Sequence, residues 1–481
     1  MHIRTIARII GFFALGFGLI LLAPLAVAAL YGEDEIGHFL EAIGASLGTG
    51  LAFLLAGGRA RHDLNNRDGF LVVALFWAGV GSLASLPFVL SAHLGPVDAL
   101  FEAVSAFTTT GATVISGLDD LPHSLLFYRQ LLQWLGGMGM IVLAIAVLPM
   151  LGIGGMQLYK AEAPGPFKEE KLTPRLNQTA RYLWGFYVGM TGACALAYWL
   201  AGMSGFDAVS HAFSTVSTGG FSTHDASLGF FDNPLIEGIA ILFMTLGAIN
   251  FSVHYLAWRQ RSLLTYLGNV EVRTFLLIIL AVVLVIGGFL HFAGTYPDYN
   301  SALRNSIFEV VSVITSTGFG TVDFSHWPSF VPVLLIFISF IGGCGGSTAG
   351  GMKVMRIVLL THQGWREVRR LIHPRAQLPI HVGNQVVSVQ TVQAVWGFMA
   401  AYVVSFVILM LLMMATGLDQ VSAFSAIAAT MNNLGPGLGE VATSFSSVSE
   451  PGKLIAVFAM LLGRLEIFTI LVLMTPEFWR A

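Results

Sequence analysis

The sequence predicts an all-α membrane protein in which four similar units surround one axis, after an N-terminal pair of helices. Of the 481 residues, 55% are hydrophobic and only 11% are charged, against roughly 25% charged in an ordinary soluble domain. Apolar runs long enough to cross a bilayer recur along the whole chain. Shorter segments ending in Thr, Ser, Asn and Gly lie between several of them.

Ten apolar runs are predicted to span the membrane, because a crossing helix needs roughly 20 mostly apolar residues. The first run is too long for the core of a signal peptide, which is roughly 7 to 15 residues, so we expect a retained helix. The runs lie near residues 9–30, 38–57, 69–92, 125–150, 180–203, 234–257, 274–294, 330–349, 392–416 and 453–475.

Four shorter segments, near residues 97–110, 205–218, 303–317 and 420–433, are predicted to be re-entrant helices. Each is too short to span. Irregular backbone at membrane depth persists only where protein buries it or a water-filled path receives it. Four such segments therefore predict a lined cavity.

The positions of Lys and Arg predict that both termini are cytoplasmic, since short cytoplasmic loops are enriched in these residues. The opposite face is mainly acidic and would concentrate cations. Four cations lie outside the cytoplasmic segments: Arg129, Arg304, Lys453 and Arg464. The predicted cytoplasmic cations are Arg4, Arg8, Arg59, Arg61, Arg67, Lys160, Lys168, Lys171, Arg175, Arg181, Arg259, Arg261, Arg273, Lys353, Arg356, Arg366, Arg369, Arg370, Arg375 and Arg480.

Each re-entrant segment ends in a glycine, and we align the four on Gly111, Gly219, Gly318 and Gly435. A ring of backbone carbonyls can replace the hydration shell of a cation, and glycine lets the backbone bend so that these carbonyls face one axis. A single glycine of this kind is as readily a helix cap, but four at comparable spacing favour a filter. The third loop, Ser316 to Gly320, is close to the potassium-channel filter sequence Thr-Val-Gly-Tyr-Gly.

The predicted filter residues surround these glycines, and the fourth loop diverges most. It has Leu434 where the other three have Thr, and Pro436 follows its glycine. The predicted ion-binding residues are Thr109, Thr110, Gly111, Ala112, Ser217, Thr218, Gly219, Gly220, Ser316, Thr317, Gly318, Phe319, Asn433, Leu434, Gly435 and Pro436.

The predicted architecture is thus four pseudo-repeats of helix, pore helix, filter loop and helix around one pore, plus the N-terminal helix pair. An internal duplication of this kind divides the chain at a near-fixed period. The predicted units are the helix pair 1–62 and the pore repeats 63–165, 166–262, 263–376 and 377–481.

A glycine-rich stretch interrupts the second helix of the third repeat and is predicted to be a movable gate below the filter. Glycine at this density lowers helix stability by up to ~1 kcal/mol per residue. Close helix packing through small residues is the alternative, whereas a phosphate-binding loop lacks its Gly-x-x-x-x-Gly-Lys order. The predicted gate residues are Gly342, Gly343, Gly345, Gly346, Ser347, Thr348, Gly350, Gly351, Lys353 and Arg464.

Arg464 is included because it lies within an apolar run, where a charge costs several kcal/mol unless it faces protein or water. An ion pair with Glu466 is the alternative role, although residues two apart on a helix point to different sides. His211, Glu102 and Glu309 lie on the pore helices, where we expect positions satisfied by hydrogen bonds. Cys194 and Cys344 are expected to be unpaired thiols.

On its four loops and glycine-rich stretch, the chain resembles the TrkH branch of the Trk, Ktr and HKT potassium transporters over nearly its full length. This resemblance implies potassium uptake across a bacterial cytoplasmic membrane, potassium bound in the filter, a homodimer, and a cytosolic nucleotide-binding regulator of the TrkA kind. It also implies that glycine at the first filter position, Gly111, goes with potassium selectivity, and that the glycine-rich loop is a gate.

Three other functions fit the sequence less well. An alternating-access cation symporter also uses broken helices and internal repeats, but typically has two related halves. An intramembrane enzyme would need a nucleophile with a base or a metal-ligand set, and neither arrangement occurs in the sequence, so the chain is predicted not to be an enzyme. Nucleic-acid binding is not expected, and neither is a covalent cofactor. The basic segments 160–181 and 356–375 are candidate surfaces for the regulator or for anionic lipid.

Overall fold

The computed structural model describes residues 1–58, 65–142, 176–383 and 385–480, and within these ranges nearly every element is a helix. The one sheet there is an antiparallel pair, β1 (His381–Val382) and β2 (Gln385–Val386). Six described helices are long and apolar enough to cross a membrane, or seven if one bent pair counts as a single span. The predicted all-α membrane fold is confirmed.

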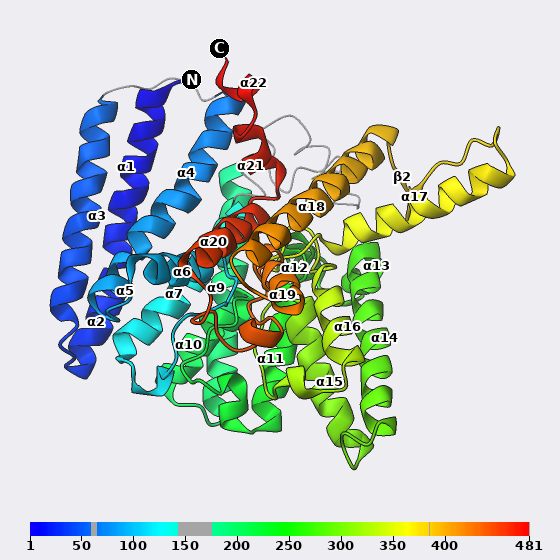
Figure 1. The fold of residues 1–481 in the computed structure, drawn as a ribbon, viewed down its shortest axis with the longest axis horizontal. Helices are drawn as coiled ribbons and strands as arrows, with labels where there is room; N and C mark the ends of the chain where they lie inside the picture. Colours follow the sequence, from blue (N-terminus) through cyan, green and yellow to red (C-terminus); the bar gives the residue numbers. More distant parts are fainter. Residues whose placement is uncertain (59–64, 143–175, 384, 481) are drawn as a thin grey trace.

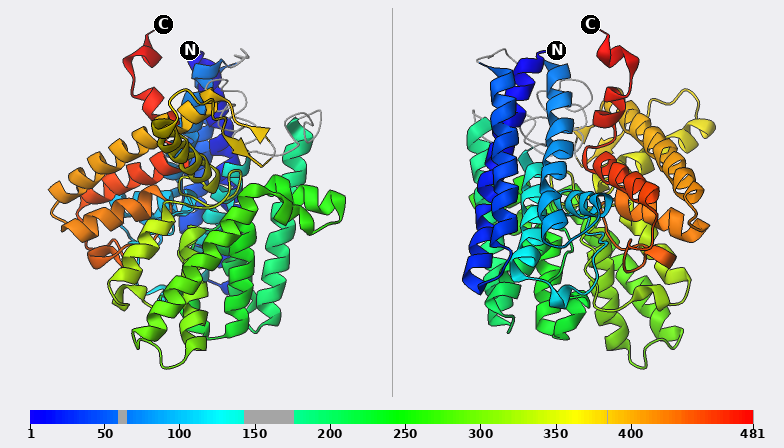
Figure 2. Two further views of the ribbon diagram at one scale, coloured as in Figure 1. Left: turned by 90° about the vertical axis from the view of Figure 1, so that its right-hand side faces the viewer. Right: turned by 60° about the vertical axis from the view of Figure 1, so that its left-hand side comes forward.

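The N-terminal pair lies at one side of the bundle (Figures 1 and 2), where α1 (Ile3–Ile20) and α2 (Leu22–Tyr31) run alongside α3 (Ile36–Gly57). Small residues allow close contact, since a Cβ on Gly11 would lie 2.9 Å from the Gly50 carbonyl oxygen. Such close approach is how helices associate within a bilayer.

The rest of the chain repeats one pattern four times: a long helix, a short buried helix, and a second helix. The long helices are α4 (Asn66–Ala84) with α5 (Leu86–Leu90), α9 (Leu176–Leu200), α14 (Val270–Phe292) and α18 (Val389–Ala415). The short pore helices are α6 (Pro96–Phe107), α10 (Gly205–Val216), α15 (Tyr299–Ile314) and α19 (Gln420–Met431). The second helices are α7 (His123–Val142), α11 (Pro234–Gly247) with α12 (Phe251–Gln260), α16 (Phe330–Ser339) with α17 (Val354–Ile372), and α20 (Glu450–Arg464) with α21 (Phe468–Leu473).

All four predicted pore helices are present, and polar caps start three of them. Ser204, Asp298 and Asp419 each accept a hydrogen bond from a backbone N–H in the first turn, which satisfies donors that have no partner within the helix. Short helices and turns complete the description: α13 (Leu264–Gly268), α22 (Pro476–Trp479), and the 3-10 turns η1 (Leu118–Asp120), η4 (Ser227–Phe231), η5 (Phe324–His326) and η6 (Gly439–Val441).

Two predicted spans, 234–257 and 453–475, are wrong as continuous helices, whereas the predicted interruption at the glycine-rich end of the run 330–349 is present. Helices α11 and α12 meet at 97°, α16 stops at Ser339 before the glycine-rich stretch, and α20 stops at Arg464. The apolar runs conceal these breaks because other parts of the protein satisfy the exposed backbone. Cys344 N, for example, donates to Ala248 O at 2.8 Å. Hydropathy does not detect irregular backbone that is buried in protein.

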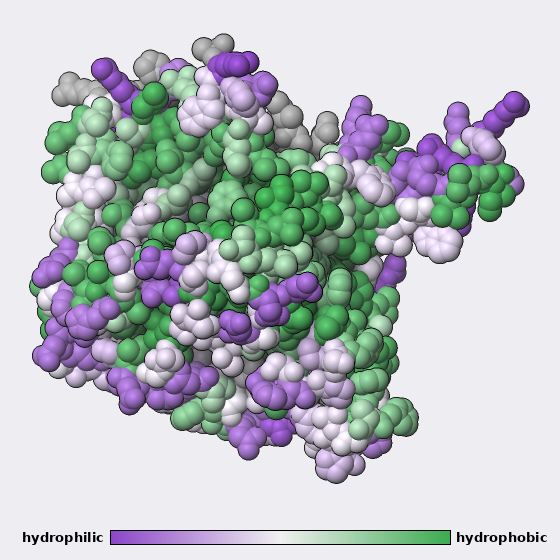
Figure 3. Space-filling model, in the orientation of Figure 1, coloured by the Kyte–Doolittle hydropathy of each residue, from purple (hydrophilic) through white to green (hydrophobic). Residues whose placement is uncertain are grey.

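Apolar residues cover much of the face in Figure 3, and hydrophilic residues gather along its lower edge and on the projecting α17. Arg356, predicted to be a cytoplasmic surface cation, is instead 1% exposed, and it pairs with Glu466 at 2.7 Å. Both cysteines are buried and free, as predicted. Arg59, Arg61 and residues 143–175 lie outside the described residues. The predicted boundaries 62/63 and 165/166 and most of segment 160–181 lie there as well.

Candidate functional site

The four pore helices end in the same backbone conformation. The residue two positions before a glycine has a left-handed backbone in each loop: Thr109 (φ 55°), Thr218 (φ 51°), Ser316 (φ 52°) and Asn433 (φ 53°). The glycines that follow have φ of 80° at Gly111, 81° at Gly220, 80° at Gly318 and 98° at Gly435. A positive φ strains any residue other than glycine. The four loops are therefore structurally equivalent.

This equivalence corrects the second loop of the predicted alignment. The counterpart of Gly111 is Gly220, whereas Gly219 takes the place of Thr110. Because the loop contains two adjacent glycines, aligning on the first shifts it by one position. The sequence does contain a signal that fixes the register, since a serine stands six positions before the structural glycine in the first three loops: Ser105, Ser214 and Ser312.

The four loops meet in a closed ring. An added Cβ would come within 3.0 Å of a carbonyl oxygen of the next loop at every glycine: Gly111 against Gly219, Gly220 against Thr317, Gly318 against Leu434, and Gly435 against Thr110. Real Cβ atoms do not make contacts that short. One hollow is lined by all four glycines. The predicted filter residues are thus brought together around a common centre.

Hydroxyl groups beside the ring bond within the loops and hold them to the pore helices. Thr108 Oγ1 lies 2.7 Å from Thr110 Oγ1, and Thr315 Oγ1 lies 2.7 Å from Thr317 Oγ1. In the divergent fourth loop, Asn433 Nδ2 donates to Thr110 Oγ1 at 2.9 Å, which ties the last loop to the first.

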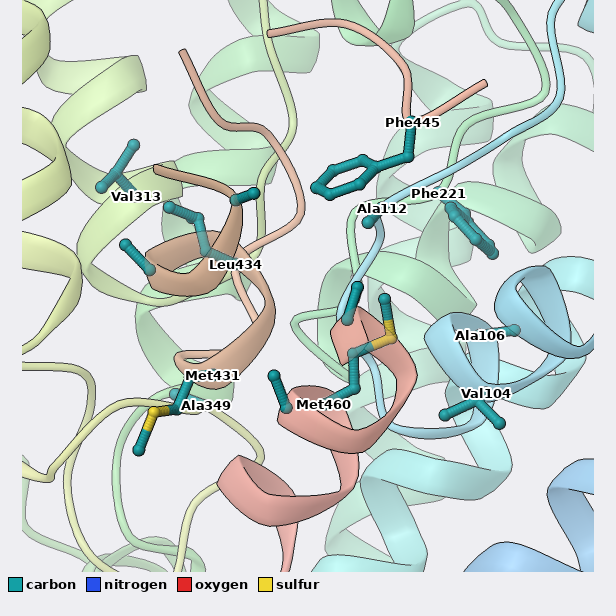
Figure 4. Packing of buried hydrophobic residues seen from close by; sticks show 14 of the residues in the cluster. Val104, Ala106, Ala112, Phe221, Val313, Ala349, Met431, Leu434, Phe445 and Met460 are labelled. Atoms are coloured by element: carbon teal, nitrogen blue, oxygen red, sulfur yellow. The ribbon is translucent and has the colours of Figure 1, made fainter. Parts of the chain in front are cut away.

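Apolar side chains pack around the ring (Figure 4). Leu434 follows the end of α19, Phe445 and Phe221 lie near Ala112, and all belong to one buried cluster with Ala349 of the glycine-rich stretch. A ring set in a close-packed apolar surround has little freedom to change its diameter.

Three of the four positions nine residues before the ring glycines carry Glu102, His211 and Glu309. His211 lies 2.9 Å from Ser222 Oγ, and Glu309 accepts from Thr321 N at 2.9 Å. Glu102 pairs with Arg129 at 2.7 Å, and both side chains are at most 1% exposed. Each group thus binds the chain that leaves its loop, as Glu102 does by accepting from Val114 N at 3.0 Å. The predicted hydrogen bonds are present, but Glu309 is satisfied only in part, because its Oε2 has no hydrogen-bond partner among the described residues. No pattern in the sequence indicates Arg129, 27 residues further along the chain, as the partner of Glu102.

The glycine-rich stretch touches three of the four pore-helix ends. Thr348 Oγ1 donates to Val216 O at 3.2 Å, Gly350 N donates to Ser316 Oγ at 2.5 Å, and Gly351 N donates to Asn432 O at 3.1 Å. The stretch therefore lies directly against the ring, on the side where the pore helices end.

The other predicted gate residues anchor this stretch to the second and third repeats. Gly345 N donates to Glu271 Oε1 at 2.8 Å, and Phe251 N donates to Gly346 O at 3.2 Å. Gly342 and Gly343 approach the backbone or Cβ of Ala349 to Gly351 too closely for larger residues. Ser347 Oγ donates to Cys344 O at 2.6 Å. Lys353 Nζ donates to Ala349 O.

Arg464 connects this stretch to the first repeat. It is 2% exposed and donates to Thr348 O at 2.9 Å and to Gly136 O at 3.0 Å. Its alternative partner, Glu466, pairs with Arg356 instead. Among the described residues Arg464 has no carboxylate partner within 4.0 Å, whereas the other three outlying cations do: Arg129 with Glu102, Arg304 with Glu237, and Lys453 with Asp98.

Similarity to known proteins extends over the whole chain. The family described as TrkH, cation transport protein, matches residues 43–480. The Trk system potassium uptake protein TrkH of Vibrio parahaemolyticus is 51% identical, and that of Escherichia coli K12 is 47% identical, each alignment covering 100% of both chains. The Trk system potassium uptake protein TrkG of Escherichia coli K12 is 40% identical over 100% of this chain and 99% of its own.

A solved structure agrees with these relatives. The crystal structure of the potassium transporter TrkH from Vibrio parahaemolyticus matches with a TM-score of 0.93, at 49% identity and with 100% of both chains covered. These relatives are named as transporters, in accord with the prediction that the chain is not an enzyme. Because the family match covers about nine-tenths of the chain and these relatives align over all of it, the chain belongs to the TrkH family of cation transport proteins.

Proposed function

We propose that this multi-pass membrane protein takes up potassium ions across the bacterial cytoplasmic membrane through one pore per chain. One observation carries the proposal: the equivalent glycine of each of the four loops packs against a carbonyl of the next loop in a ring, and the four glycines line a single hollow. Carbonyl oxygens held in such a ring can replace the water around a monovalent cation. The C-terminal ends of four pore helices add partial negative charge toward the same centre.

Potassium is the ion that the relatives' names point to, since they are potassium uptake proteins. The ion-binding positions are the predicted ones, with Gly219 taken as the equivalent of Thr110 and Gly220 as the equivalent of Gly111. All four ring positions are glycine, so each loop can adopt its positive φ without strain and turn its carbonyl oxygens toward the centre. The same closed ring of four loops does not favour the alternating-access symporter.

The glycine-rich stretch 342–351, with Lys353 and Arg464, is the proposed gate. It lies against the ring where an ion leaving the filter would pass. Arg464 is a buried positive charge that has no carboxylate partner among the described residues. In a medium of low dielectric this charge repels a cation. Opening requires that both the stretch and Arg464 move, so that the bonds to Thr348 O and Gly136 O break together.

The remaining assignments follow from the family and from charge. We propose a homodimer with cytoplasmic termini, the five units with the predicted boundaries, and a cytosolic TrkA-like nucleotide-binding regulator. The relatives' designation as parts of a Trk system supports a regulator. Helix α17, which projects from the bundle (Figures 1 and 2) and carries Arg366, Arg369 and Arg370, is the proposed docking surface within the described residues.

Isotope flux into proteoliposomes tests the proposal. The purified chain, reconstituted alone, should admit radioactive rubidium down a potassium gradient, and external potassium should compete far better than external sodium. Equal competition by the two ions would contradict the filter. Changing the pH or sodium gradient at constant voltage separates a channel from coupled transport. Only in coupled transport would the direction of net potassium or rubidium flux depend on that gradient.

A matched pair of glycine variants ties this flux to the ring. Gly318→Ala places a Cβ within 3.0 Å of the Leu434 carbonyl oxygen, whereas Gly44→Ala on α3 meets nothing within 4 Å. The first should lose selective flux, and the second should behave as the unchanged chain does. Equal flux in both variants would show that ions do not pass through the ring.

A further inference from the structure

The filter loops are held from behind by different groups in different repeats. Ser105 Oγ of pore helix α6 donates to Ala112 O at 2.5 Å, and Ser312 Oγ of α15 donates to Phe319 O at 2.6 Å. In both cases the hydroxyl of a serine six residues before the ring glycine donates to the carbonyl oxygen of the residue that directly follows this glycine. This bond fixes how the peptide that follows the glycine is turned.

The second repeat departs from this arrangement although its sequence retains the serine. Ser214 stands six residues before Gly220, and its buried hydroxyl has no hydrogen-bond partner among the described residues. The fourth repeat has Ala429 at this position and so has no hydroxyl to offer. Its loop contains Pro436, whose ring restricts the backbone directly after Gly435.

The side chain of Gln133 on α7 holds the second loop instead. Its Nε2 donates to Gly219 O at 2.6 Å, and its Oε1 accepts from Phe221 N at 3.1 Å. The amide thus bonds both sides of Gly220, as a neighbouring strand would. Gln133 is completely buried, and a Cβ on Gly219 would meet its amide within 3.0 Å.

Gly219 O is itself part of the ring, since it is the carbonyl that Gly111 of the first loop packs against. A hydrogen bond to this oxygen competes with any ion for its lone pairs, and it sets the direction in which the carbonyl points. No side-chain donor to the equivalent carbonyls of Thr110, Thr317 and Leu434 occurs among the described residues. The four-fold ring is therefore asymmetric at this level.

We infer that Gln133 is a positioning residue for ion selectivity. It sets the orientation of the Gly219 carbonyl through Nε2 and of the Phe221 peptide through Oε1, and so determines how the second loop coordinates a dehydrated ion. The inference rests on the proposed filter function and adds to it a residue that lies on α7, outside every filter loop.

Two substitutions of Gln133 test this inference. Gln133→Leu removes both bonds at similar volume, and Gln133→Glu keeps an acceptor for Phe221 N but loses the donor to Gly219 O. Loss of a hydrogen bond at a coordinating oxygen should lower the potassium-over-sodium flux ratio by about tenfold. Thermal stability and the gel-filtration profile report folding separately.

The matched control is Gln130→Leu, one turn away on α7. Gln130 is also completely buried, and its amide has no hydrogen-bond partner among the described residues, so the ion ratio should stay unchanged. A second comparison sets Ser312→Ala, expected to lower the ratio, against Ser214→Ala, expected to leave it.

The outcomes separate the inference from the function beneath it. Flux without potassium preference in the unchanged chain would overturn the proposed filter. A selective unchanged chain with an equally selective, folded Gln133→Leu variant would overturn the role of Gln133 alone. A Gln133→Leu variant that loses flux at a constant ion ratio would likewise show a purely structural role.

Discussion

Replacing Arg464 by Met is expected to raise ion flux when no regulator is present. Two hydrogen bonds from the guanidinium, at 2.9 Å to Thr348 O and 3.0 Å to Gly136 O, hold the glycine-rich stretch against the first repeat. Met fills much of the same volume but can donate no hydrogen bond. The closed arrangement loses both bonds, whereas the open arrangement, in which they are already broken, loses nothing.

The size of the effect follows from these contacts. A hydrogen bond to a charged group contributes about 1.5–3 kcal/mol, so at the lower end the closed state loses about 3 kcal/mol relative to the open state. Since each 1.4 kcal/mol is about a factor of ten, the open-to-closed ratio should rise about 100-fold. Removing a buried positive charge from the ion's route acts in the same direction.

Rubidium uptake into liposomes that contain only the purified chain measures this change. Arg464→Lys should give an intermediate rate, because it keeps the charge but not the forked donor geometry. Arg259→Met, an exposed arginine at the end of α12, is the control for loss of a cation and should match the unchanged chain. A folded Arg464→Met variant with the flux of that control would refute the proposed gate.

Three further predictions concern the ring and its outer side. Gly111→Ser should weaken discrimination against sodium, because it puts a side chain at φ 80° against the Gly219 carbonyl. An unchanged potassium-to-sodium permeability ratio would show that this loop does not coordinate the ion. Arg129→Met leaves Glu102 buried without its partner and should cost about 3–5 kcal/mol, read as a lower midpoint in thermal or denaturant unfolding. Combining it with Glu102→Leu should recover most of the loss, and a double variant no more stable than the single one would contradict the ion-pair explanation. The hydrogen bond from His224 holds the pKa of Asp119 below its usual range. Its stabilisation is therefore present above the ordinary Asp pKa and lost as the pH falls through the lowered value. Asp119→Asn should remove this part of the acid dependence of the melting temperature, and an unaltered pH profile would count against it.

The four-fold pattern could be predicted from the sequence because pore helices carry local signals. Each is a short apolar segment, and each ends in polar residues and a glycine whose conformation is set within a few residues. The position of Gly220 could be predicted as well, because Ser214 stands six residues before it, as Ser105 and Ser312 stand before Gly111 and Gly318. Choosing the first glycine of the pair was an error of alignment, and it was corrected by backbone conformation.

The breaks in α11–α12 and α20–α21 could not be predicted in this way. Their sequences are as apolar as continuous helices, and the backbone groups they expose are satisfied by residues far away in the chain, as Ala248 O is by Cys344 N. The partners of Arg356 and Arg464 were hidden for the same reason. Glu466 lies close to Arg464 in sequence, yet it pairs with Arg356 across two repeats.

The sequence by itself determined the membrane class, the four pore helices and the presence of glycine in each loop, since these depend on hydropathy, local capping and the steric freedom of one residue. Only the tertiary structure decided that the loops close into one ring, that the glycine-rich stretch lies against it, and that Gln133 and Arg464 hold these parts. Those contacts join residues from different repeats, and no pattern within a single segment determines which distant atom will satisfy a buried polar group.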